Sequence, residues 1–123
     1  KQIRFFFSAQ EREKMIAAVY RDEPRVHIVR WDGIIVDLLK KEETPFYVRG
    51  LRNTVDFDYE TADFYASRDF DDSLIALYIP AEQRHLHVSS TLVKNCIAFG
   101  KDCSRYVPQA VAEYIAKRGN SHV

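Results

Sequence analysis

The most constraining feature of this sequence is an uninterrupted apolar run, LIALYI, at residues 74–79, which is followed by Pro80. Consecutive apolar side chains without alternation are typical of a strand whose two faces are both covered, as in a parallel sheet. Pro80 cannot donate a hydrogen bond to a neighbouring strand, so it marks the end of the run. The run therefore predicts a buried strand of a parallel sheet.

Helical and strand-like segments alternate around this run. Two further segments, VHIVRW at residues 26–31 and FYV at residues 46–48, have the β-branched and aromatic composition of strands. Amphipathic patterns and capping signals predict helices between the strands and after them. This alternation indicates an α/β fold with a Rossmann-like parallel sheet and flanking helices. The helices are expected from the capping box at Ser8, at residues 34–39, 55–70 and 89–99, and from Pro108 to Gly119.

The composition excludes several classes of protein. The 123 residues fit one domain, which we expect at residues 1–119 with a loose tail at 120–123. The 18 basic and 18 acidic residues balance, so the chain lacks the basic excess of a non-specific nucleic-acid binder. No apolar run is long enough to span a bilayer, so we expect no membrane partner.

Two arginines, Arg49 and Arg52, flank a Gly-Leu pair directly after the predicted strand at residues 46–48. Ligands of open α/β sheets bind outside the carboxyl ends of the strands. A guanidinium is a planar, permanently charged fork that suits phosphate, and a glycine lets backbone approach a ligand closely. The alternative is that both arginines are surface residues paired with Asp56 or Glu60. The residues alone leave both interpretations open.

A hydroxyl cluster, Ser89, Ser90 and Thr91, opens the predicted helix at residues 89–99. A helix N-terminus with hydroxyls and backbone N–H groups is suited to an anion, although a plain N-cap would explain one of these hydroxyls equally well. Upstream, His85 and His87 would share one face of an extended segment. No third ligand stands near them, so we expect no metal site.

The motifs resemble a known family. VRGLR at residues 48–52 with DFDYE at 56–60, VSSTLVK at 88–94, and more weakly FSAQER at 7–12, are similar to segments of bacterial phosphopantetheine adenylyltransferases, which belong to the HxGH nucleotidyltransferase superfamily. The resemblance implies transfer of an adenylyl group from ATP, with Mg²⁺, to 4'-phosphopantetheine. The products would be pyrophosphate and dephospho-CoA, in coenzyme A biosynthesis. It also implies a cytoplasmic homohexamer.

The resemblance assigns expected roles to individual residues. Arg52 would stabilise charge on the ATP phosphates and is the candidate catalytic residue, whereas Arg49 would hold the phosphate of phosphopantetheine. Ile35 would line the pantetheine pocket, and Lys1 is the candidate for a lysine that contacts substrate phosphate. The ATP site would comprise Gly50, Leu51, Arg52, Glu60, His85, Leu86, His87, Val88, Ser89, Ser90 and Thr91. Within it, Glu60 would meet the ribose, and Ser90 and Thr91 would contact the triphosphate.

The sequence also departs from the family pattern. The first strand and the T-x-G-H motif are absent, and an ungapped alignment places Ile3 where the family has its lysine. We expect these missing elements upstream of Lys1, and we expect residues 1–123 alone to expose apolar sheet faces and to be inactive. Two other functions stay open. One is a non-catalytic nucleotide- or CoA-binding module, and the other is a nucleotidyltransferase for another acceptor, such as glycerol phosphate or nicotinamide mononucleotide.

Overall fold

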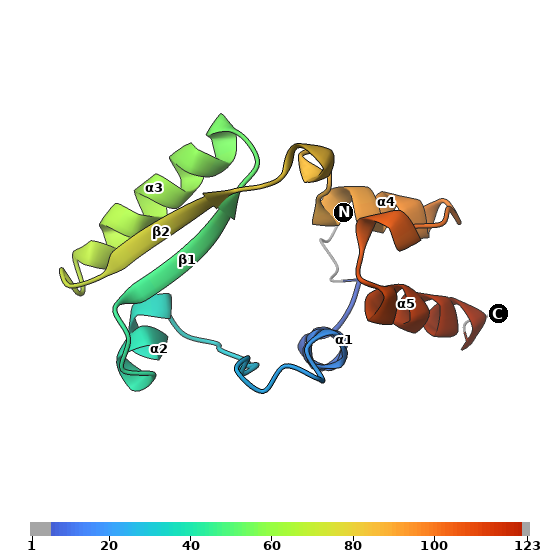
Figure 1. Ribbon diagram of the computed structural model, residues 1–123, viewed down its shortest axis with the longest axis horizontal. Helices are drawn as coiled ribbons and strands as arrows, with labels where there is room; N and C mark the ends of the chain where they lie inside the picture. Colours follow the sequence, from blue (N-terminus) through green and yellow to red (C-terminus); the bar gives the residue numbers. More distant parts are fainter. Residues whose placement is uncertain (1–5, 122–123) are drawn as a thin grey trace. The chain divides into compact units, whose positions relative to one another are not determined.

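The computed structural model describes residues 6–121, which form two compact units (Figure 1). Unit 1 comprises residues 6–30 and 88–121, and unit 2 comprises residues 31–87. Unit 1 contains α1 (Ala9–Val19), α4 (Ser90–Ala98), the 3-10 turn η2 (Ser104–Tyr106) and α5 (Gln109–Ser121). Unit 2 contains α2 (Ile35–Lys41), β1 (Phe46–Leu51), α3 (Thr54–Arg68), β2 (Ile75–Pro80) and the 3-10 turn η1 (Gln83–His85).

The two strands of unit 2 form a parallel sheet. Their register pairs Phe46 with Ile75 at one end and Leu51 with Pro80 at the other. The crossover helix α3 lies along one face of this sheet (Figure 1). There the ring of Phe57 on α3 meets the ring of Tyr78 on β2 edge to face, with centroids 5.8 Å apart. The β–α–β arrangement confirms the predicted α/β class with a parallel sheet.

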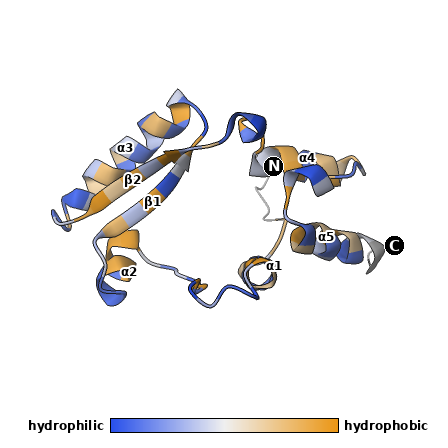
Figure 2. Cartoon of the chain, in the orientation of Figure 1, coloured by the Kyte–Doolittle hydropathy of each residue, from blue (hydrophilic) through white to orange (hydrophobic). Residues whose placement is uncertain are grey.

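The other face of the sheet is open, which corrects the expectation of a strand buried on both faces. Both strands contain hydrophobic residues (Figure 2). On the face away from α3 the exposed fractions are 54% for Val48, 47% for Leu77 and 59% for Ile79. The physical reason is that α3 covers only the face on which Arg49 and Tyr78 lie as register partners. Exposed apolar sheet surface was itself one of the expectations from the sequence.

Residues 26–31 do not form the predicted strand. They are irregular, and Val26 and Val29 are 37% and 44% exposed. The N–H of Val26 donates to the carbonyl of Glu23 at 3.1 Å, in a turn. No strand among residues 6–121 pairs with this segment. Because β-propensity reflects packing against neighbouring strands, β-branched composition alone does not produce a strand.

Local capping fixes the helix ends in unit 1. The capping box is confirmed: Ser8 Oγ accepts from the N–H of Glu11 at 3.1 Å, and Glu11 Oε1 accepts from the N–H of Ser8 at 3.0 Å. After α4, Gly100 has a φ of 67°, and its N–H donates to the carbonyl of Ile97 at 3.2 Å. The glycine in α5, Gly119, does not adopt this left-handed conformation. The helix therefore continues to Ser121, into the segment expected to be a tail.

Helices α1 and α5 pack together in unit 1. The hydroxyl of Tyr114 donates to Glu11 Oε2 at 3.0 Å, and the guanidinium of Arg118 lies 3.5 Å from the same oxygen. Arg118 also donates to the carbonyl of Phe6, and its guanidinium lies over the ring of Phe7. This cluster fixes the segment that leads into α1.

Candidate functional site

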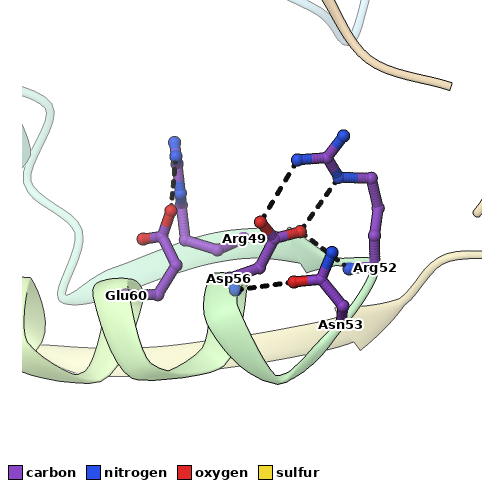
Figure 3. A network of polar contacts seen from close by, with 5 residues as sticks. All are labelled: Arg49, Arg52, Asn53, Asp56 and Glu60. Carbon is purple, nitrogen blue, oxygen red and sulfur yellow. Dashed lines mark hydrogen bonds and ion pairs between the residues drawn. The ribbon is translucent and has the colours of Figure 1, made fainter. Parts of the chain in front are cut away.

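The turn between β1 and α3 places two arginines beside the first turns of a helix. Strand β1 continues to Leu51, so Arg49 lies within the strand and only Arg52 follows it, which corrects the expectation that both come after the strand. Asn53 caps α3 by accepting the N–H of Asp56 at 2.9 Å. This cap starts the helix immediately after Arg52 and brings two of its carboxylates next to the arginines (Figure 3).

Arg49 is paired with a buried carboxylate. Its Nη2 lies 2.7 Å from Oε1 of Glu60, which is only 6% exposed. The Arg49 side chain is 45% exposed, and its guanidinium lies 5.6 Å from the centre of the Tyr47 ring. The hydrogen bond to Glu60 raises the pKa of Arg49, so the group stays charged. The second oxygen of Glu60, Oε2, is buried and has no hydrogen-bond partner among the described residues.

Arg52 and Asp56 form a two-point pair. Arg52 Nε donates to Asp56 Oδ2 at 3.0 Å and Nη2 donates to Oδ1 at 3.2 Å. The backbone N–H of Arg52 also donates to Oδ2 at 3.0 Å. The bidentate geometry holds the plane of the guanidinium as well as its position. These bonds lower the pKa of Asp56 and raise the pKa of Arg52.

The geometry therefore bears out the pairing of the arginines with Asp56 and Glu60, and phosphate binding stays a prediction. The two interpretations are compatible for Arg49, because Glu60 accepts from a single nitrogen of a side chain that is 45% exposed. A guanidinium carries five donors, so an anion can approach from the exposed side. Glu60 is buried and its Oε1 accepts from Arg49. Its expected contact with ribose stays a prediction.

The Arg52–Asp56 pair predicts a specific acid sensitivity. The pKa of Asp56 in the folded chain lies below its ordinary value of 3.8. The stability that this carboxylate contributes is therefore present above pH 3.8 and is lost as the pH falls through the lower, folded-state pKa. We expect Asp56→Asn to lose less stability than the wild type between about pH 6 and about pH 2. Urea denaturation at several pH values measures this, and parallel losses in the two proteins would contradict it.

A second polar cluster lies at the start of α4 in unit 1. Ser89 is the N-cap, and its Oγ accepts the N–H of Leu92 at 3.1 Å. The plain N-cap interpretation is therefore correct for Ser89, while Ser90 and Thr91 are exposed in the first turn. A pocket of about 520 Å³ opens beside this helix end, and its polar lining consists of Arg12, Ser89, Ser90, Lys94 and Tyr106.

The other predicted site residues are distributed over both units. Ile35 is the half-buried first residue of α2, Gly50 and Leu51 end β1, and His85 ends η1. Exposed Leu86 and His87 follow η1 in unit 2, whereas Val88 begins the second segment of unit 1. Lys1 lies outside the described residues. The arginine cluster and the hydroxyl cluster thus belong to different units, and their common site stays a prediction.

Comparison with known proteins identifies the family. The Cytidylyltransferase-like family matches residues 1–96. A phosphopantetheine adenylyltransferase of Lachnoclostridium phytofermentans is 32% identical over 114 residues, which are 93% of this chain and 70% of that protein. Its counterpart in Clostridium beijerinckii is 32% identical over 117 residues, or 95% and 74%. Another, in Coxiella burnetii strain RSA 493, is 35% identical over 109 residues, or 89% and 68%. The chain belongs to the phosphopantetheine adenylyltransferase family.

Membership of the phosphopantetheine adenylyltransferase family confirms the resemblance that the motifs indicated. It also agrees with the Rossmann-type interpretation of the parallel strands. Family membership does not test the roles expected for individual residues, and these roles stay predictions.

Two residues of the unit 1 pocket, Arg12 and Lys94, were missed as site candidates. Both were part of motifs that carried the family resemblance, FSAQER at residues 7–12 and VSSTLVK at 88–94. The sequence did indicate Lys94, because Lys94 is four residues after Ser90 and therefore lies on the same face of the predicted helix. Arg12 comes from α1, and its place in a pocket beside α4 depends on the packing of separate helices.

Proposed function

We propose that this member of the family transfers the adenylyl group of ATP to the phosphate of 4'-phosphopantetheine, giving dephospho-CoA and pyrophosphate. The observation that carries the proposal is the arginine pair at the end of β1, with each guanidinium held by a carboxylate of α3. Two fixed cations near the end of a parallel strand suit two phosphorylated substrates. The named relatives, at 32–35% identity over most of the chain, support the choice of substrates.

In this proposal the arginines divide the phosphates between them. Arg49 holds the phosphate of the acceptor, whose oxygen attacks the α-phosphorus of ATP. The bond between that phosphorus and the pyrophosphate oxygen breaks, and negative charge develops on the leaving pyrophosphate. Arg52 stabilises that charge, because positioning and charge stabilisation supply most of the catalysis in transfers of this kind.

The pocket of unit 1 is proposed to receive polyphosphate. Ser90 and Thr91 present hydroxyls at the N-terminus of α4, where backbone N–H groups favour an anion. Arg12 and Lys94 add positive charge to the lining. We further propose nucleotide contacts for Gly50, Leu51, Glu60, His85, Leu86, His87 and Val88, and a pantetheine contact for Ile35.

Magnesium enters this proposal as part of the MgATP substrate. Mg²⁺ usually keeps several waters and binds through substrate phosphates and one or two carboxylates. Among residues 6–121, no group of three or more His, Cys, Asp or Glu side chains is arranged to hold a metal ion. We assign the ion to the phosphates of ATP, where Mg²⁺ usually binds.

The test is a product assay on the protein expressed from its natural reading frame. With ATP, Mg²⁺ and 4'-phosphopantetheine, we expect pyrophosphate and dephospho-CoA in equal amounts, measured by an enzyme-coupled assay and by mass spectrometry. Binding of both substrates without products would instead indicate a non-catalytic module. Faster turnover of glycerol phosphate or nicotinamide mononucleotide would overturn the choice of acceptor.

The assembly and location are proposals as well. The family resemblance supports a homohexamer in the cytoplasm. Within the described part of the chain, no helix combines the length and the apolar character that a membrane crossing needs. Light scattering coupled to size-exclusion chromatography measures the number of subunits directly.

A further inference from the structure

A second pocket of unit 1, here called the α5 pocket, has no part in the proposed reaction. Its volume is about 580 Å³, within the range of about 300–1,000 Å³ that is usual for small-molecule sites. Its walls come from the segment before α1, from the end of α4 with the turn that follows it, and from the second half of α5. None of these residues is assigned to ATP or to phosphopantetheine.

The lining of the α5 pocket is mainly apolar. Two aromatic rings before α1 and three aliphatic side chains from α4 and α5 contribute to it: Phe6, Phe7, Ile97, Ile115 and Ala116. The remaining apolar positions are two glycines, Gly100 and Gly119. A Cβ at either glycine would meet no atom within 4 Å apart from the adjoining backbone. An apolar ligand can therefore remove much of its own surface from water here, which is a main source of affinity.

Two cations add charge to this lining. Lys101 is exposed in the turn after α4. Arg118 is already engaged, because its Nε lies 3.5 Å from Glu11 Oε2 and its guanidinium lies 4.5 Å from the centre of the Phe7 ring. Glu11 thus balances one of the two positive charges. The remaining charge of about one suits a ligand with a single negative charge.

The polar groups of the α5 pocket differ from those at the start of α4. In the part of the chain that the structure describes, no hydroxyl, amide or carboxylate side chain lines the α5 pocket. The pocket at the start of α4 has the hydroxyls of Ser89, Ser90 and Tyr106. A polyphosphate would bring several charges into the α5 pocket and find few donors for its oxygens.

We propose that the α5 pocket binds a monocarboxylate with an apolar chain. The chain lies against the phenylalanine and aliphatic side chains, and the carboxylate lies at Lys101 and Arg118. A guanidinium carries five donors, so Arg118 can donate to a carboxylate and keep its contacts with Glu11 and with the carbonyl of Phe6. The inference is independent of the proposed function, because its test measures binding in a pocket to which neither substrate is assigned.

The test uses decanoate as the probe and the protein expressed from its natural reading frame. Calorimetry gives the Kd and the number of sites. Acetate has the same head group without the chain, and decyltrimethylammonium has the same chain with a positive head group. We expect one saturable decanoate site per chain, and binding at least tenfold weaker for each comparison probe. Acetate lacks the apolar surface, and the ammonium group meets charges of its own sign.

Three variants locate the site. Gly119→Phe places a ring in the pocket lining and should weaken decanoate binding at least tenfold; its Tm should not fall, because a glycine within a helix is replaced by a better helix former. Lys101→Gln should weaken binding about three- to fivefold, as for loss of an exposed ion pair. The control is Lys117→Gln, the same change at an exposed lysine of α5 outside the lining, which should leave the Kd within about twofold.

The contrary outcomes are distinct. Decanoate binding that Gly119→Phe leaves intact in a folded protein would lie elsewhere and would overturn the inference. Absence of saturable binding would also overturn it, and would indicate that the pocket is closed by another part of the protein or by a second copy. If Gly119→Phe lowers the Tm, the two lysine variants decide, and equal Kd values for Lys101→Gln and Lys117→Gln would contradict the site.

Discussion

Arg52→Ala is expected to lower kcat by on the order of 10²-fold or more, the usual effect of removing a donor that stabilises charge in a transition state. The two-point pair with Asp56 holds the guanidinium before substrate arrives, so alanine removes a preorganised cation rather than a flexible one. The measurement is kcat for dephospho-CoA formation at saturating concentrations of both substrates. Binding of the acceptor should change little, because that phosphate is assigned to Arg49.

The matched control is Arg25→Ala, which removes another arginine paired with a nearby carboxylate. The Arg25 side chain is 87% exposed and lies in no candidate site, so kcat should be unchanged. Arg52→Lys provides a second comparison. It keeps the charge but not the fork, so we expect only part of the turnover to return. Activity of Arg52→Ala within a few fold of the wild type would remove Arg52 from the mechanism.

The sequence predicted those features of the fold that depend on local chemistry. The apolar run at residues 74–79 forms β2, and the capping box at Ser8 begins α1 as expected. Residues 26–31 show the limit of such reasoning. Their composition suits a strand, but a strand also needs a neighbour with which to form hydrogen bonds, and the described chain offers none. The open face of β2 has the same origin, because coverage depends on packing by another element.

The candidate site was predictable in its residues but not in its pairing. The spacing of Arg49, Arg52, Asp56 and Glu60 allowed either arginine to meet either carboxylate. Only the turn at Asn53, which sets where α3 begins relative to β1, decides the partners. The burial of Glu60 was equally hidden, because acidic residues on a helix are usually solvated. Its burial follows from the face that α3 turns toward the sheet.

Arg49→Ala is expected to reduce the free energy of unfolding by about 2–3 kcal/mol, because it leaves the buried Glu60 carboxylate without its cation. This is below the roughly 3–5 kcal/mol for a fully buried pair, since the 45% exposure of Arg49 lets solvent weaken the interaction. Urea denaturation followed by fluorescence measures the loss. The only tryptophan of the chain, Trp31, lies in unit 2 with this pair and reports on it.

Two comparisons show whether the loss comes from the stranded carboxylate. Adding Glu60→Leu to Arg49→Ala should recover much of the stability, because an apolar side chain at this buried position needs no partner. Arg25→Ala breaks an exposed pair and should change stability by less than about 1 kcal/mol. If Arg49→Ala were no more harmful than Arg25→Ala, Glu60 would not depend on Arg49 for its charge compensation. The buried carboxylate would then be satisfied in another way.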